Sequence, residues 1–288
     1  MTLTAILGSV AILGGLGLTF GILIAVANRK LWVWEDPRID AVSGMLPGTN
    51  CGACGQAGCR AFAEAIIAGT IPPASCTVMS PDDIQDVAGF LGVDAGAAVK
   101  RVARLLCAGG SNVAIQHAEY RGLSTCTAAA AVAGGGKGCT WGCLGLADCE
   151  VVCDQNAIFM NDVGLPVVIP ELCTACNDCV EVCPKDLFVL MPMEQKLIVQ
   201  CRSLLEGEEV EALCSVACNG CGRCVADAAP GLIRMEQGLA VIDYSKNELA
   251  EPAATRRCPT GAIVWVDGVQ SSLLGPGAQI AVGGSKAR

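Results

Sequence analysis

The chain has 288 residues and a formal net charge of −9, and 20 of its residues are cysteine whereas only one is histidine. The acidic balance argues against nucleic acid as a partner, because nucleic-acid binding needs a basic face. Cysteine at this density is typical either of secreted disulfide scaffolds or of metal-binding proteins. Here the cysteines are grouped at C-x2-C spacing, and no cleavable signal peptide is evident. Both observations favour metal binding over disulfides.

The first predicted element is an apolar run from Leu3 to Ala27 that holds no charged residue. As a helix it would be about 38 Å long at 1.5 Å per residue, enough to cross a bilayer, although a buried helix of a soluble protein is the alternative. Arg29 and Lys30 follow, and the positive-inside rule then places the bulk of the protein on the cytoplasmic side. We therefore expect residues 1–30 to be a single-pass anchor in the lipid of the bacterial cytoplasmic (inner) membrane.

Residues 31–100 are expected to form a small helical domain with one [4Fe-4S] cluster. Glycines in its cysteine-containing loop let backbone amides approach and hydrogen-bond cluster sulfurs. A short helix is predicted over 60–68, stopped by Gly69, and a second helix should start at Ser80, which serves as its cap. The predicted ligands of cluster 1 are Cys51, Cys54, Cys59 and Cys76.

Residues 101–138, which end in the small-residue stretch AAAAVAGGGKG, are expected to be a linker region. Residues 139–195 should form a two-cluster ferredoxin-like domain, because they contain the bacterial ferredoxin run C-x2-C-x2-C-x3-C-P starting at Cys173. Short strands are expected at 167–169 and 188–190.

In two-cluster ferredoxins, three cysteines of each run share a cluster with the last cysteine of the other run. The first run here has the spacing C-x3-C-x5-C-x3-C and begins at Cys139. The predicted ligands are Cys139, Cys143, Cys149 and Cys183 for cluster 2, and Cys153, Cys173, Cys176 and Cys179 for cluster 3.

A second such unit is expected over residues 196–268, because the cysteine spacing that begins at Cys126 repeats from Cys201. One cluster of this unit has lost all of its ligands, since the positions where cysteines would stand hold Ala228, Glu248, Glu251 and Ala254. The unit therefore resembles a two-cluster module reduced to one. The predicted ligands of its cluster 4 are Cys218, Cys221, Cys224 and Cys258.

The four cysteines left over are Cys107, Cys126, Cys201 and Cys214. They could bind a fifth cluster, or they could be buried free thiols, which pack as small hydrophobic groups. A third hypothesis is that Cys214 replaces Cys221 as a ligand, as Cys139 does in the first unit. We expect four [4Fe-4S] clusters with the fifth left open; about sixteen iron atoms in the protein would exclude it.

Taken together, the chain is predicted to be α+β: an N-terminal transmembrane helix, a small helical [4Fe-4S] domain, then tandem bacterial-ferredoxin-like domains. Residues 269–288 are rich in glycine, alanine and serine and are expected to be a flexible tail. No flavin or NAD fingerprint occurs in the sequence.

The order of these motifs resembles the B subunit of the Rnf (or Rsx) electron-transport complex, in its longer, many-cluster version. The resemblance is carried by the apolar helix, NCGACGQAGC with a later cysteine, GCTWGCLGLADC and the ferredoxin run, and it extends to about Ile263. It implies an electron-transfer subunit of an ion-translocating oxidoreductase, a translocase, that exchanges electrons with soluble ferredoxin. It also implies that the NADH and flavin sites lie on other membrane and peripheral subunits, so that this chain has no catalytic residues of its own.

Two other functions remain open: a membrane-tethered polyferredoxin serving another reductase, such as a redox-sensor reducing system, and an interaction protein whose clusters only stabilise its structure. Membrane subunits that co-purify with the chain would favour the electron-transfer subunit of a translocase. Reduction by ferredoxin without such partners would favour the tethered polyferredoxin. Clusters that resist reduction would favour the interaction protein. Ferredoxin is typically acidic, so candidate docking residues are the basic Lys185, Arg202, Arg223, Arg256 and Arg257.

Overall fold

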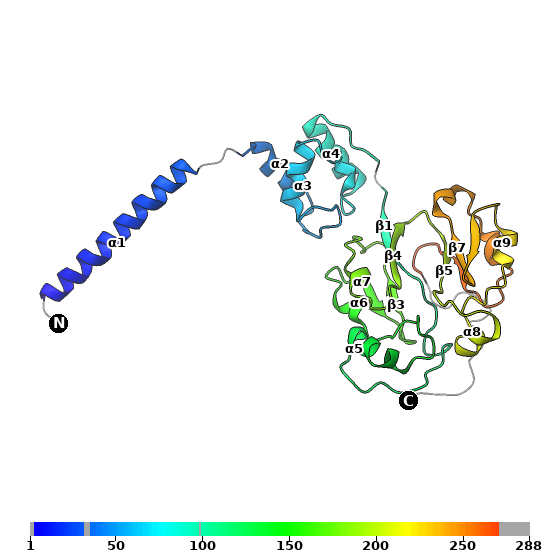
Figure 1. Ribbon diagram of the computed structural model, residues 1–288. Coiled ribbons are helices and arrows are strands. Elements are labelled where there is room, and N and C mark those ends of the chain that lie inside the picture. The colour runs from blue at the N-terminus through cyan, green and yellow to red at the C-terminus, as the bar shows by residue number, and fades with distance from the viewer. Residues whose placement is uncertain (1–2, 32–34, 98, 271–288) are drawn as a thin grey trace.

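The structure is a computed structural model that describes residues 3–31, 35–97 and 99–270. It contains one long helix, a small helical domain and a larger body of short helices and strands (Figure 1). The mixture of helix and strand agrees with the α+β expectation. The segment 271–288, expected as a flexible tail, lies outside the described residues.

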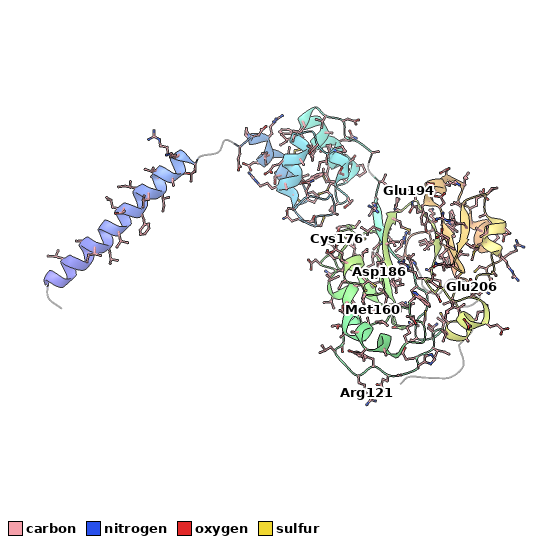
Figure 2. All side chains as sticks on the ribbon, viewed as in Figure 1. Arg121, Met160, Cys176, Asp186, Glu194 and Glu206 are labelled. Carbon is pink, nitrogen blue, oxygen red and sulfur yellow. The ribbon has the colours of Figure 1, made fainter. Side chains whose placement is uncertain are left out.

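Helix α1 spans Leu3–Lys30, and every side chain described along it is exposed. Its segment Val10–Lys30 has a mean hydropathy of 2.4 and is 0% buried. Figure 2 shows these side chains projecting from the helix without packing against the rest of the chain. By length and composition the helix can cross a membrane, and its apolar surface favours membrane association.

The small helical domain follows α1 in the chain. Helix α4 begins after Ser80 with a capping box, in which the Ser80 side chain accepts from the Asp83 N–H and the Asp83 side chain accepts from the Ser80 N–H. The helix predicted over 60–68 is α3, shifted by one residue, with Gly69 following at φ +70°. Phe62, Ile66, Val42 and Val87 form the centre of its core. The elements are α2 (Pro37–Met45), α3 (Cys59–Ile67), η1 (Pro73–Ser75) and α4 (Pro81–Leu91).

The first ferredoxin-like module is built from two antiparallel strand pairs, β1 with β4 and β2 with β3. Ala103 lies opposite Leu190 in the first pair, and Ile158 lies opposite Val168 in the second. The strands expected at 167–169 and 188–190 correspond to β3 and β4. The elements are β1 (Arg101–Leu105), α5 (Cys126–Ala131), η2 (Ala133–Gly136), α6 (Asp148–Val151), β2 (Ile158–Met160), β3 (Pro166–Val168), α7 (Asp178–Glu181) and β4 (Phe188–Pro192).

The C-terminal module has the same kind of construction, with β5 paired to β8 and β6 paired to β7. A small apolar cluster of Met191, Ile198, Val264 and Val266 packs it against the first module. The elements are β5 (Leu197–Val199), α8 (Gly207–Leu213), α9 (Arg223–Asp227), β6 (Ile233–Glu236), β7 (Leu239–Ile242), η3 (Tyr244–Leu249), η4 (Pro252–Thr255) and β8 (Ile263–Trp265).

The segment 101–138, expected as a linker, is integrated into both modules. Its first residues form β1, in which Val102, Ala103 and Leu105 are buried against β4 and its surroundings. Further along, the Ala108 N–H donates to the Gln200 carbonyl at 3.1 Å and the Ile115 N–H donates to the Leu213 carbonyl at 2.9 Å. The reason for the difference is that this segment's apolar residues and backbone groups find partners on both modules, which composition alone does not reveal.

Candidate iron–sulfur cluster sites

The structure gathers its cysteines into sets of four. All 20 are described, and all of them are free thiols rather than disulfides. Within the described part of the chain, no three histidine, cysteine or carboxylate side chains converge closely enough to hold a single metal ion. The thiols instead surround cavities, and four of these cavities have nearly equal open volumes of about 320 to 340 Å³, adjoining solvent included. Thiols around a space, rather than around a point, fit an iron–sulfur cube better than mononuclear zinc.

Site 1 lies in the small helical domain and contains the four cysteines expected there: Cys51, Cys54, Cys59 and Cys76. The loop before α3 is held by Asn50, whose side-chain oxygen accepts from the Cys59 N–H at 2.8 Å. Burial raises the pKa of Cys76, and hydrogen bonds from the backbone N–H groups of Val78 and Met79 oppose this rise. Such N–H donors are what a cluster-binding sulfur requires.

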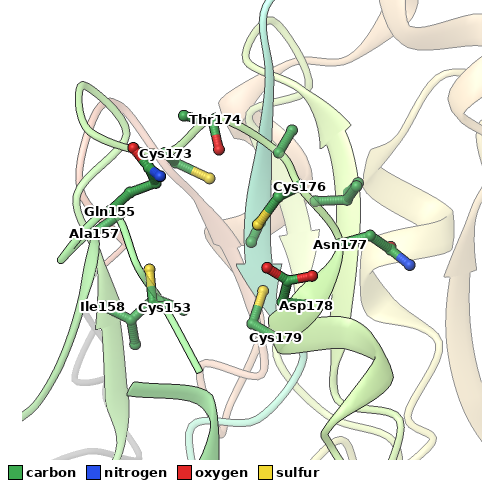
Figure 3. A pocket seen from close by; sticks show the side chains of 13 residues that line it. Cys153, Gln155, Ala157, Ile158, Cys173, Thr174, Cys176, Asn177, Asp178 and Cys179 are labelled. Atoms are coloured by element: carbon green, nitrogen blue, oxygen red, sulfur yellow. The ribbon is translucent and has the colours of Figure 1, made fainter. Parts of the chain in front are cut away.

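Site 3 also contains its four expected cysteines, whose sulfurs point into one space (Figure 3): Cys153, Cys173, Cys176 and Cys179. Burial, and then the neighbouring thiols, raise the pKa of Cys179 to about 12. Arg104 of β1 is 1% exposed and lies near this site, where the charge of Cys173 partly offsets the burial that lowers the pKa of the guanidinium.

Site 4 lies in the C-terminal module and contains Cys218, Cys221, Cys224 and Cys258, as expected. Cys221 is the single exposed cysteine of the 20.

The four positions where the ligands of the lost cluster would stand differ in their exposure to solvent. Ala254 is buried and Ala228 packs against the same core, whereas Glu248 and Glu251 are exposed. Two of the four positions are therefore packed into the apolar core, and the other two face solvent.

At site 2, the cysteines that lie together differ by one from the set expected from the sequence. Burial, and then the thiols of Cys143, Cys126 and Cys183, raise the pKa of Cys149 above its usual range. Cys126 therefore lies beside Cys143, Cys149 and Cys183, where the sequence predicts Cys139. The Cys126 sulfur receives hydrogen bonds from the backbone N–H groups of Asp148 and Leu146, which oppose the burial that raises its pKa. The thiols that neighbour one another at site 2 are thus those of Cys126, Cys143, Cys149 and Cys183.

The physical reason for this change is visible at Leu146. The normal ferredoxin spacing C-x2-C-x2-C, read from Cys143, places the second cysteine at position 146, which is leucine here. Helix α5 brings Cys126 over this position, because the N–H of Thr127 donates to the Asp148 carboxylate at 3.1 Å. The leucine at a ligand position was the available signal that a distant cysteine must complete the site.

Cys139 lies instead in a separate cavity between the two modules, which we call the junction site. Its four cysteines are Cys107, Cys139, Cys201 and Cys214. Cys107, Cys201 and Cys214 are buried and Cys139 is half-buried. The hypothesis that Cys214 replaces Cys221 in site 4 does not match this arrangement, because Cys221 lines site 4 and Cys214 lines the junction cavity.

The basic residues proposed for docking fall in different places. Arg223 and Arg256 are exposed beside site 4, since each lies within two residues of one of its cysteines. Arg257 forms an ion pair with Asp227. Arg202 lines the junction site and donates to the Asp186 carbonyl, and Lys185 is half-buried.

Comparison with known proteins agrees with this geometry. A family model for an Fe-S cluster domain matches residues 46–78, which enclose site 1. A second family model, the 4Fe-4S binding domain, matches residues 166–188, which enclose the ferredoxin run. Both matches support the conclusion that these cysteines bind iron–sulfur clusters.

Curated relatives match over most of the chain. The B subunit of the Na(+)-translocating ferredoxin:NAD(+) oxidoreductase complex of Acetobacterium woodii is 43% identical over 85% of this chain and 73% of the relative. The B subunit of the ion-translocating oxidoreductase complex of Methanosarcina acetivorans is 36% identical over 90% of this chain and 98% of the relative. The B subunit of the proton-translocating ferredoxin:NAD(+) oxidoreductase complex of Clostridium ljungdahlii is 35% identical over 86% and 88% respectively.

Proposed function

This chain belongs to the B-subunit family of Rnf-type ion-translocating oxidoreductase complexes, and from that membership we propose that it relays single electrons from reduced ferredoxin towards NAD-linked partner subunits. It is an electron-transfer subunit of a translocase. The observation that carries the proposal is the grouping of its cysteines into four-thiol sites that follow one another through the fold.

We propose that sites 1 to 4 each bind one [4Fe-4S] cluster, with Cys126 replacing Cys139 at site 2. The donor sets fit this group, because each offers four thiols, and backbone N–H groups point at sulfurs in several of them. When bound, a [4Fe-4S] cluster supplies a one-electron carrier whose potential is set by hydrogen bonds to sulfur, nearby charge and exposure. The two modules then correspond to tandem ferredoxin-like domains, the second reduced to one cluster.

Sites 2, 3 and 1 follow one another in space. Sites 2 and 3 are neighbours within one module, since the thiol of Cys179 in site 3 contributes to the raised pKa of Cys149 in site 2. Site 3 then meets site 1 where the Thr77 hydroxyl donates to the Thr174 carbonyl at 2.6 Å. Thr77 lines site 1 and Thr174 lines site 3. An electron at site 2 can therefore move to site 3 and then to site 1.

Site 4 has the properties of the place where electrons arrive. Its Cys221 is exposed, so a soluble protein can bring its own cluster close to it. The exposed Arg223 and Arg256 beside it supply positive charge in a chain whose net charge is −9. Complementary charge attracts an acidic ferredoxin and orients it during the encounter.

The opposite end of the molecule is directed to the membrane. Figure 1 places the helical domain, which holds site 1, between α1 and the larger body. We propose that α1 spans the cytoplasmic membrane once, with the larger body on the cytoplasmic side, because Arg29 and Lys30 lie in its last turn. Site 1 would then be the cluster closest to the membrane-bound partner subunits.

The test uses the complex purified from membranes. Neighbouring subunits should co-purify with the chain, and reduced ferredoxin should reduce its clusters. Changing Arg256→Glu should slow this reduction about tenfold at low ionic strength, and added salt should diminish the difference. Arg121→Glu is the matched control, because Arg121 is also exposed but lies far from α9 (Figures 1 and 2).

Two results would contradict the relay function. Clusters that ferredoxin reduces equally well in a chain that never associates with membrane subunits would indicate a tethered polyferredoxin. Clusters that no physiological donor reduces would indicate a purely structural role.

A further inference from the structure

The junction site joins residues from four separate segments of the chain. Cys107 follows β1, Cys139 follows η2, and Cys201 and Cys214 flank α8 in the C-terminal module. The cavity they line has an open volume of about 340 Å³, compared with about 320 to 330 Å³ at sites 1, 3 and 4. Four thiols therefore line one cavity here, as four thiols do at sites 1, 3 and 4.

The sulfurs of this set also share a local geometry. In all four cases the backbone N–H two residues further along the chain points at the sulfur: Gly109 for Cys107, Trp141 for Cys139, Ser203 for Cys201 and Val216 for Cys214. The same arrangement occurs at Cys76 of site 1, with Val78, and at Cys176 of site 3, with Asp178. Donors aimed at sulfur stabilise the thiolate form, which is the form that binds iron.

The backbone and one charge complete the cavity. A Cβ on Gly109 would lie 3.1 Å from the Cys214 sulfur and 3.7 Å from the Cys107 sulfur, so glycine lets the chain pass close to both without a tight contact. Lys137 also lines the cavity, and its ammonium donates to the carbonyls of Gly109 and Cys143, each at 2.6 Å. A cation fixed at this place would offset part of the negative charge of four thiolates.

The flanking sites are connected to the junction site in a symmetrical way. Cys143 of site 2 donates its backbone N–H to the Cys107 sulfur at 3.5 Å. Cys218 of site 4 donates its backbone N–H to the Cys201 sulfur. A ligand of each flanking site thus hydrogen-bonds a sulfur of the junction site, which lies between them.

We propose that Cys107, Cys139, Cys201 and Cys214 bind a fifth [4Fe-4S] cluster, and that electrons pass through it from site 4 to site 2. The ligation stands on the geometry alone, whereas the electron path rests on the proposed relay function. Each step moves one electron and no atom or proton: the cluster of site 4 is oxidised as the junction cluster is reduced, and the junction cluster is oxidised as that of site 2 is reduced. The reductant is the low-potential iron–sulfur protein that reduces site 4.

Ligation is tested by counting iron and altered centres in the full-length protein purified without oxygen. The wild type should contain about twenty iron atoms, four for each of five clusters. The variant Cys139→Ala/Cys201→Ala should change one centre in the low-temperature electron paramagnetic resonance spectrum of the reduced protein. The variant Cys126→Ala/Cys201→Ala should change two. Val113→Ala, a change in the buried core beside the junction that replaces no cysteine, should retain all five.

About sixteen iron atoms in the wild type would overturn the ligation, as would two altered centres in Cys139→Ala/Cys201→Ala.

The electron path is tested separately by mixing the membrane complex with reduced ferredoxin and freezing it within one turnover. In Cys139→Ala/Cys201→Ala, site 4 should be reduced while sites 1, 2 and 3 remain oxidised. If those sites are reduced as fast as in the wild type, the path is wrong although the cluster is present. If ferredoxin fails to reduce even the wild type, the proposed relay function fails instead, and the iron count still stands.

Discussion

Arg104 carries a positive charge that the fold holds away from water beside site 3. Its side chain is 1% exposed, and its Nη1 donates to the Gly268 carbonyl at 2.9 Å. Its Nε has no hydrogen-bond partner among the described residues. A buried cation requires a compensating negative charge, and Cys173 of site 3 is the charged neighbour that acts on it. A cluster bound by thiolates would supply that charge.

We therefore expect Arg104→Met to make site 3 harder to reduce, because the positive charge that favours an added electron is gone. The expected shift is about −60 mV, which corresponds to about 1.4 kcal/mol of charge interaction for a one-electron couple. Arg104→Lys keeps the charge and should retain most of the potential. A redox titration followed by electron paramagnetic resonance measures both variants, and an equal shift in the two would show that charge is not the cause.

At the scale of single elements, α4 depends on its first turn. The capping box between Ser80 and Asp83 satisfies N–H groups that the helix itself leaves unpaired. The helix buries Ile84, Val87 and Ala88 in the core that also contacts Cys54, Cys59 and Cys76. Loosening of α4 should therefore be felt at site 1.

Ser80→Ala should destabilise the helical domain by about 1 kcal/mol, because it removes the cap. Site 1 should then lose iron to a chelator about five times faster, if release requires opening of this domain. Ser43→Ala, inside α2, removes a hydroxyl that caps no helix and should leave the rate unchanged. Equal rates of iron release in the two variants would show that the stability of α4 does not control the release of iron from site 1.

Local patterns in the sequence predicted these elements well. The apolar run of α1, the Ser80 cap and the C-x2-C loops each depend on residues only a few positions apart. Sites 1, 3 and 4 were predicted with the sets of cysteines that the structure brings together, because most of each set lies within one short loop.

Long-range contributions were not predicted. Leu146 marks a missing ligand in site 2, but its spacing cannot tell which distant cysteine replaces it. That choice depends on where α5 and β1 pack, and the packing of 101–138 onto both modules is a tertiary property. The exchange of Cys126 and Cys139 between two sites follows from this packing.

At the scale of the whole molecule, the helical domain meets the larger body at the hydrogen bond from Thr77 to Thr174. Thr77→Val keeps the shape of the side chain and removes the donor. We expect electron transfer from site 3 to site 1 to slow several-fold, because the two sites are no longer held at a fixed separation. Rapid freezing after mixing with ferredoxin would measure it. Thr70→Val removes a hydroxyl that bonds only within its own domain and should have no effect.

The same scale governs the response to loss of iron. The apolar core is divided into four clusters, and cysteines of the cluster sites belong to three of them. Such small cores gain much of their stability from metal. Chelation under reducing conditions should therefore abolish the near-ultraviolet circular dichroism and protease resistance of the body. Retention of both by iron-free protein would show that packing alone suffices.

The exposure of Cys221 has a cost for the cell. Molecular oxygen can reach this exposed sulfur directly, whereas Cys107, Cys201 and Cys214 of the junction are shielded by burial. Brief aeration should therefore damage the centre at site 4 first. With site 4 as the proposed entry point, the molecule would then keep most of its iron yet accept no electrons. Repair of that single centre, rather than synthesis of a new polypeptide, would restore the complex.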